Sequence, residues 1–159
     1  MAARKTFSLV QPWVSTGMRI AAGLVMIIAG YRKAEDLHAA VRATRAYEIL
    51  PESLVSIFGQ ALPFVEIAVG LFLVAGLLTR WAAFAYLLLL AVFVFGTIWA
   101  WARGLQIDCG CFGGGGAVAK ADYPGHLIDQ AIFISLGLWV AIFPVSALSL
   151  DRWLRPVVD

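Results

Sequence analysis

The chain has 159 residues, of which 62% are hydrophobic and only 14% are charged. Soluble domains are about half apolar and about a quarter charged, so this composition and a mean hydropathy of +0.87 exclude an ordinary soluble domain. The formal net charge of +2 is too small to indicate nucleic-acid binding. We therefore expect an integral membrane protein that contacts the lipid bilayer.

Four apolar segments are each close to the roughly 20 residues that a helix needs to cross a bilayer. They cover residues 13–31, 54–78, 81–101 and 127–147. None shows the alternation of a β-strand, and only helices or closed barrels satisfy the backbone polar groups in lipid. The sequence therefore predicts an all-α fold, a membrane-embedded four-helix bundle that forms a single domain over residues 1–159.

The first loop contains a short amphipathic segment between residues 34 and 50. Apolar positions recur on one helical face and charged positions on the other. The first face carries Leu37, Ala40, Val41, Thr44 and Tyr47, and the second carries Glu35, His38, Arg42 and Arg45. Pro51 would end such a helix. We expect either a short helix on the membrane surface or a solvated loop helix without a specific role.

The only two cysteines of the chain, Cys109 and Cys111, are separated by one residue in the loop 103–125. A disulfide between them would close a very small, strained ring, and strained disulfides are typically the labile or catalytic ones. Since closing so short a loop stabilises little, the spacing favours a redox pair over a structural staple. A static disulfide stays open as an alternative, as does a metal site with His38 and His126, although zinc-finger spacing is absent.

Charged residues flank the cysteine loop. Arg103 ends the third apolar segment, and Asp129 lies near the start of the fourth on the same side. We expect a salt bridge between them that closes the base of the loop. Alternatively, Arg103 lowers the pKa of a cysteine thiol and stabilises its thiolate, an effect that the charge of Asp108 opposes.

Two charged residues lie inside the apolar segments. Glu66 is about 12 residues into the second segment, roughly 18 Å deep, and Arg19 is about as far from the loop-side end of the first. A carboxylate at this depth needs a partner or a proton. Because the depths match, we expect Arg19 and Glu66 to face each other as a structural ion pair. The alternatives are a proton-coupled Glu66 beside a quinone or thiol site, and a Glu66 that is protonated.

A specific motif, Asp108-Cys109-Gly110-Cys111-Phe112-Gly113, follows a longer pattern of residues. That pattern includes Arg19, Ala29-Gly30, Lys33, Tyr47, Leu50-Pro51, Leu62-Pro63-Phe64-Val65-Glu66, Gly70 and Arg103-Gly104. Together they resemble the MauE branch of the DoxX-like membrane proteins, the methylamine-utilisation protein E family. The chain departs from this family at Leu127-Ile128-Asp129, where relatives often carry a basic residue.

The resemblance implies a four-helix bundle with a redox-associated role. The namesake of the family accompanies an extracytoplasmic thioredoxin-like partner in maturing a disulfide-rich periplasmic enzyme subunit. One cysteine pair cannot pass electrons onward alone, so it would need a bound quinone or a partner that supplies a second pair. No other cofactor is indicated. The alternative function is a non-enzymatic subunit that anchors or stabilises a larger membrane complex, with the cysteine pair as a structural disulfide.

An even number of helices places both termini on one side of the membrane. Basic residues divide about equally between the two sides, so the positive-inside rule barely decides the orientation. A disulfide persists in an oxidising compartment. We therefore favour a bacterial-type plasma membrane with cytoplasmic termini and an extracytoplasmic cysteine loop.

Overall fold

The computed structural model describes residues 2–108, 110 and 115–154. Within them lie four long helices, each long and apolar enough to cross a membrane. These are α1 (Ala2–Ala34), α3 (Glu52–Ala75), α4 (Thr79–Ala102) and α5 (Tyr123–Ile142). Two short helices, α2 (Leu37–Ala46) and α6 (Leu150–Leu154), and two short strands, β1 (Ile107–Asp108) and β2 (Gly116–Ala117), complete the described part. The prediction of an all-α, multi-pass membrane bundle is confirmed.

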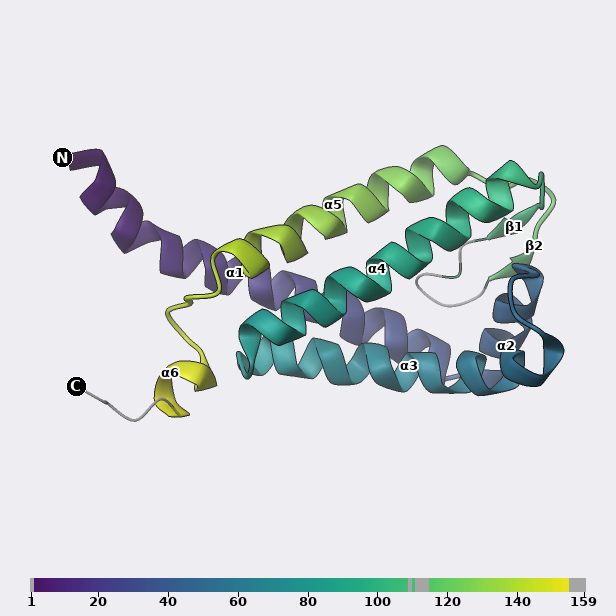
Figure 1. The fold of residues 1–159 in the computed structure, drawn as a ribbon, viewed down its shortest axis with the longest axis horizontal. Coiled ribbons are helices and arrows are strands. Elements are labelled where there is room, and N and C mark those ends of the chain that lie inside the picture. Colours follow the sequence, from purple (N-terminus) through teal and green to yellow (C-terminus); the bar gives the residue numbers. More distant parts are fainter. Residues whose placement is uncertain (1, 109, 111–114, 155–159) are drawn as a thin grey trace.

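The two ends of the bundle differ in what they carry (Figure 1). The loop end consists of residues 35–51 and 103–122 and contains α2 and the antiparallel pair β1–β2. The terminal end consists of residues 76–78 and 143–154, and α1 begins on its side, where α6 also lies. Backbone hydrogen bonds from Ala147 to Pro12 (3.1 Å) and from Asp151 to Gly76 (2.9 Å) hold the C-terminal segment there.

Helices α1 and α3 run antiparallel and approach closely because glycines lie in their contact. A Cβ atom on Gly23 would come within 2.8 Å of the Gly70 carbonyl oxygen, and one on Gly30 within 2.6 Å of the Pro63 carbonyl oxygen. Small residues are favoured at such contacts because lipid supplies no hydrophobic drive for helix association. This packing fixes the register, with residue 23 beside residue 70 and residue 30 beside residue 63.

Helix α2 packs on the first turns of α3, where a Cβ atom on Gly59 would come within 2.8 Å of the Val41 Cα atom. The charged face of α2 is exposed and its other face is at least partly buried, so the predicted amphipathic helix is confirmed. It is shorter than the segment 34–50. Asp36 caps its start by accepting a hydrogen bond from the Ala39 N–H (2.9 Å), and Glu48 has a left-handed φ of 52° just after its end.

Helix α5 begins and ends earlier than the predicted segment 127–147. Asp122 caps its start by accepting a hydrogen bond from the Gly125 N–H (3.2 Å), and Pro124 suits the first turn. At the other end, Pro144 disfavours a helical conformation of the residue before it. The capping residue and the two prolines therefore determine where α5 begins and ends, rather than the length of the apolar segment.

Candidate functional site

The loop end holds the sequence motif with the most specific chemistry, although Cys109 and Cys111 lie outside the described residues. The described frame around them starts at the β1–β2 pair, in which Asp108 lies opposite Gly116. Gly110 is buried and has a left-handed φ of 63°, a conformation that favours glycine. The motif is therefore anchored by a short antiparallel pair and by one buried glycine.

The segment that follows the cysteines, which begins at Gly115, packs on α2. A Cβ atom on Gly115 would come 2.8 Å from the Ala43 Cβ atom and 3.0 Å from the Gly110 Cα atom. With a φ of 80°, Gly115 also has a left-handed backbone that few other residues adopt. Glycines at positions 110 and 115 let these two parts of the loop and α2 approach closely, because no side chain lies between them.

Two ion pairs tie this frame to its neighbours. Arg103 Nη2 lies 3.2 Å from Glu48 Oε2 and joins the end of α4 to the linker after α2. His126 Nε2 lies 3.4 Å from Asp108 Oδ1 and joins α5 to β1 when the imidazole is protonated. The expected salt bridge between Arg103 and Asp129 is therefore wrong. Arg103 pairs instead with Glu48, while Asp129 lines a cavity between the long helices.

Tyr47, at the end of α2, lies close to the same frame. Its ring packs on α4, where a Cβ atom on Gly96 would come within 3.2 Å of it. Burial, followed by the nearby Asp108 carboxylate, raises the pKa of the Tyr47 phenol. The hydroxyl therefore keeps its proton far above neutral pH and is a neutral polar group near β1.

Inside the bundle, Glu66 forms an ion pair with Lys33. Lys33 Nζ lies 2.5 Å from Glu66 Oε1, and the two side chains are 9% and 0% exposed. Lys33 Nζ also lies 4.5 Å from the centroid of the Phe93 ring, a cation–π contact. Glu66 Oε2 is buried without a hydrogen-bond partner among the described residues. Burying two charges costs several kcal/mol per ion, so this pair is an expensive feature, as expected of a functional position in a membrane.

The expected pairing of Arg19 with Glu66 is wrong. Arg19 donates hydrogen bonds to carbonyl oxygens at the end of α3 and in the segment after α5. These are the carbonyls of Leu73, Val74 and Leu148. A cation suits the C-terminus of a helix, where carbonyl groups have no partners within the helix. Arg19 therefore caps α3 and closes the terminal end.

The expected pairing is wrong because α1 and α3 do not end at the same depth at the loop end. Residue 30 lies beside residue 63, so the first turns of α3 extend beyond α1 and pack on α2. Equal counts from the two helix ends are therefore not equal depths. The observed register places Arg19 near the end of α3, and the longer α1 brings Lys33 within reach of Glu66.

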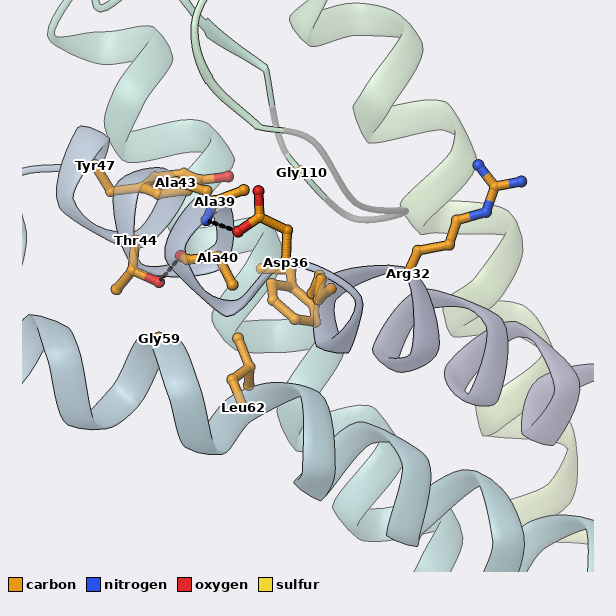
Figure 2. A pocket seen from close by; sticks show the side chains of 12 residues that line it. Arg32, Asp36, Ala39, Ala40, Ala43, Thr44, Tyr47, Gly59, Leu62 and Gly110 are labelled. Atoms are coloured by element: carbon orange, nitrogen blue, oxygen red, sulfur yellow. Dashed lines mark hydrogen bonds between the residues drawn. The ribbon is translucent and has the colours of Figure 1, made fainter.

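Two small cavities adjoin the Lys33–Glu66 pair. The first has a volume of about 80 Å³ and is lined by residues of α1 to α4 together with Gly110 of the cysteine loop. Figure 2 shows Gly110 on the loop at one side of this cavity and Gly59 and Leu62 of α3 at the other. Lys33 lines it as well, so one member of the buried ion pair shares a cavity with the residue between the cysteines.

The second cavity lies among all four long helices and has a volume of about 50 Å³. Its polar lining includes Glu66, His126 and Asp129, and Phe93 lines both cavities. Both volumes are far below the roughly 300–1,000 Å³ of small-molecule sites, and each has room for a few water molecules. The described residues thus form no preformed pocket here for a quinone ring.

Sequence reasoning missed two of these partners. From the sequence, Lys33 belongs only to the family pattern, because it follows the predicted end of the first apolar segment. Continuing the helix to residue 34 would have revealed it as a second cation facing α3. From the sequence, His126 is only a candidate metal ligand, and no sequence signal places it beside Asp108, since that contact depends on the β1–β2 pair.

Comparisons with known proteins identify the family of this chain. A family model described as "Methylamine utilisation protein MauE" matches residues 11–143, which include α2 to α5, most of α1 and the cysteine loop. A curated relative, "Methylamine utilization protein MauE" of Paracoccus denitrificans, is 35% identical over 108 residues. The alignment covers 67% of this chain and 58% of the relative, so the chain spans under two thirds of that protein. No solved structure matches.

Proposed function

Because this chain belongs to the MauE family, we propose that it is a membrane component of thiol–disulfide exchange. In this proposal, Cys109 and Cys111 exchange with an extracytoplasmic thioredoxin-like protein and so support the maturation of exported proteins. The name of the Paracoccus relative assigns that protein to methylamine utilisation. We assign this chain a role in the maturation of exported proteins, and we do not assign the protein that is matured.

The observation that supports this proposal most is the frame around the Cys-Gly-Cys motif. Both cysteines are covalently joined to Gly110, which is buried and left-handed. The loop is closed by β1–β2, packs on α2 through Gly115 and is tied to α5 through the Asp108–His126 pair. These attachments hold the described neighbours of the two cysteines, Asp108 and Gly110, at the loop end of the bundle.

The proposed exchange balances without a further reactant. The thiolate of one cysteine attacks the disulfide of the partner, and one partner sulfur leaves as a thiolate. The second cysteine then attacks the mixed disulfide and releases the other partner sulfur. The pair is thereby oxidised to a disulfide and the partner disulfide is reduced to two thiols. The reverse sequence of steps oxidises the partner.

Trapping of the mixed disulfide tests the proposal. The single variants Cys109→Ser and Cys111→Ser should each retain one thiol and accumulate a mixed disulfide with a thioredoxin-like protein, visible as a reducible band. The double variant is the matched control: it should form no such band and lose the redox phenotype. It should still insert into the membrane, because the apolar helices drive insertion.

Two results would contradict the proposal. Full function of the double variant would favour the alternative, a non-enzymatic subunit of a larger membrane complex. A requirement for both cysteines without any mixed disulfide would indicate a structural disulfide or a metal site, which mass spectrometry of the unreduced protein and metal analysis would tell apart.

A further inference from the structure

The terminal end contains a cavity of about 580 Å³, at the opposite end of the bundle from the cysteine loop (Figure 1). Three segments far apart in the sequence form its walls: the α3–α4 turn with the first residues of α4, the linker after α5, and α6. Its volume falls in the range of roughly 300–1,000 Å³ that is typical of ligand sites. Unlike the two small cavities beside Lys33 and Glu66, it has room for a chemical group larger than water.

The cavity is positively charged. Arg80 and Arg152 both line it, both are exposed, and neither forms an ion pair within the described residues. The one carboxylate among its described lining residues, Asp151, already accepts hydrogen bonds from the backbone N–H groups of Leu78 (2.7 Å) and Thr79 (2.8 Å). Since the planar guanidinium group matches phosphate oxygens in pairs, two arginines at one cavity favour a phosphate ligand.

Two hydroxyl groups in the same walls lack a hydrogen-bond partner within the described part of the chain. Thr79 and Ser146 both line the cavity, and each residue is 2% exposed. Their side-chain oxygens are buried without a hydrogen-bond partner among the described residues. Buried polar groups are normally hydrogen-bonded because leaving one unpaired costs stability. After rotation of the side chain to another staggered conformation, a phosphate oxygen in the cavity would supply the missing acceptor.

The surroundings of the cavity are apolar and lie where a membrane-crossing helix begins. Trp81 and Val145 line it and are 72% and 65% exposed. Exposed tryptophan is typical of the boundary between the lipid headgroups and the hydrocarbon core. A charged cavity bordered by exposed apolar side chains fits an amphiphile better than a free ion.

We propose that this cavity binds the phosphate headgroup of an anionic membrane lipid. Arg80 and Arg152 contact the phosphate, and the acyl chains lie along Trp81 and Val145. The bound lipid bridges the α3–α4 turn and α6, two segments that Asp151 already connects. It therefore stabilises the terminal end of the bundle, independently of the cysteine chemistry at the loop end.

The test uses the purified full-length chain in a neutral detergent, with thermal unfolding and native mass spectrometry as measurements. Phosphatidylglycerol should raise the melting temperature saturably and remain bound in the mass spectrum. Phosphatidylcholine should do neither at the same concentration. Inorganic phosphate at the same concentration should also have no effect. An equal saturable rise with inorganic phosphate would show a free-phosphate site and overturn the lipid assignment.

Variants link the effect to the two arginines. Arg80→Gln combined with Arg152→Gln should weaken phosphatidylglycerol binding about tenfold or more, since charge-assisted hydrogen bonds are lost. Replacing both arginines by lysine keeps the positive charges but removes the planar guanidinium groups, so the affinity for phosphatidylglycerol should be intermediate. The matched control Arg42→Gln removes an exposed arginine of α2, at the loop end, and should bind as the wild type does. Unchanged binding in the double glutamine variant, or equal binding of the two lipids, would overturn the proposal.

Discussion

Replacing Lys33 by methionine should destabilise this protein more than replacing Glu66 by glutamine, and replacing both should recover part of the loss. Lys33→Met removes the donor 2.5 Å from Glu66 Oε1 and leaves a fully buried carboxyl group without a partner on either oxygen among the described residues. Removing one member of a buried pair costs about 3–5 kcal/mol. Because the pair is 9% and 0% exposed, solvent screens little of this effect.

The other two variants should cost less. In Glu66→Gln the amide oxygen can still accept from Lys33, and the ammonium group keeps its position 4.5 Å from the Phe93 ring centroid, so we expect a loss of about 1–3 kcal/mol. The double variant has no charge at this site and leaves only a buried neutral amide without its partner, which costs about 1–3 kcal/mol. The two single losses should therefore exceed the loss in the double variant by at least ~2 kcal/mol.

Thermal unfolding in detergent, followed by circular dichroism, measures these differences. For a chain of this size, 1 kcal/mol corresponds to about 2–4 °C, so Lys33→Met should lower the melting temperature by roughly 10 °C. The matched control is Arg45→Gln, which breaks the exposed pair of Arg45 with Glu52. It should leave the melting temperature almost unchanged. The reasoning is refuted if Lys33→Met costs no more than this control, or if the two single losses add fully.

Two further predictions follow from the register and from the proposed orientation. Arg19→Gln should destabilise the bundle, because three carbonyl groups at the terminal end lose the guanidinium group as a donor. Its loss should add to that of Glu66→Gln within about 0.5 kcal/mol, since the two groups share no partner, and a strong coupling in the same melts would contradict the register. Impermeant maleimide applied to reduced intact cells should label Cys109 or Cys111 if the cysteine loop is extracytoplasmic. Labelling that requires an opened inner membrane would reverse the orientation.

The elements of this fold could be predicted because their signals are local. Apolar length identifies the four long helices, and the periodicity of the segment 34–50 identifies α2, since both depend only on neighbouring residues. The strands β1 and β2 could not be predicted in this way. Each has only two residues, and they exist because Asp108 and Gly116 meet across the cysteine loop.

The pairing of the intramembrane charges depends instead on how helices are offset along one another. Glycine contacts fix the offset of α1 and α3, and the packing of α2 on Gly59 allows α3 to extend beyond α1. Neither contact is visible in a count of residues from helix ends. A depth argument therefore identifies which charges are buried but not which of them meet, and here it assigned Glu66 to the wrong cation.

The corrected pairing changes what the two buried cations do. Arg19 lies at the terminal end, where its hydrogen bonds within the described residues go to carbonyl groups, while Lys33 lies at the loop end, where it lines a cavity with Gly110. The expensive buried charge pair thus lies beside the segment that carries both cysteines, whereas the helix cap lies at the other end of the bundle. Stability of the membrane domain alone would not require Lys33 and Glu66, because apolar residues of similar volume would pack there at no greater cost. Their position beside Gly110 therefore supports the exchange chemistry that we propose for the loop end.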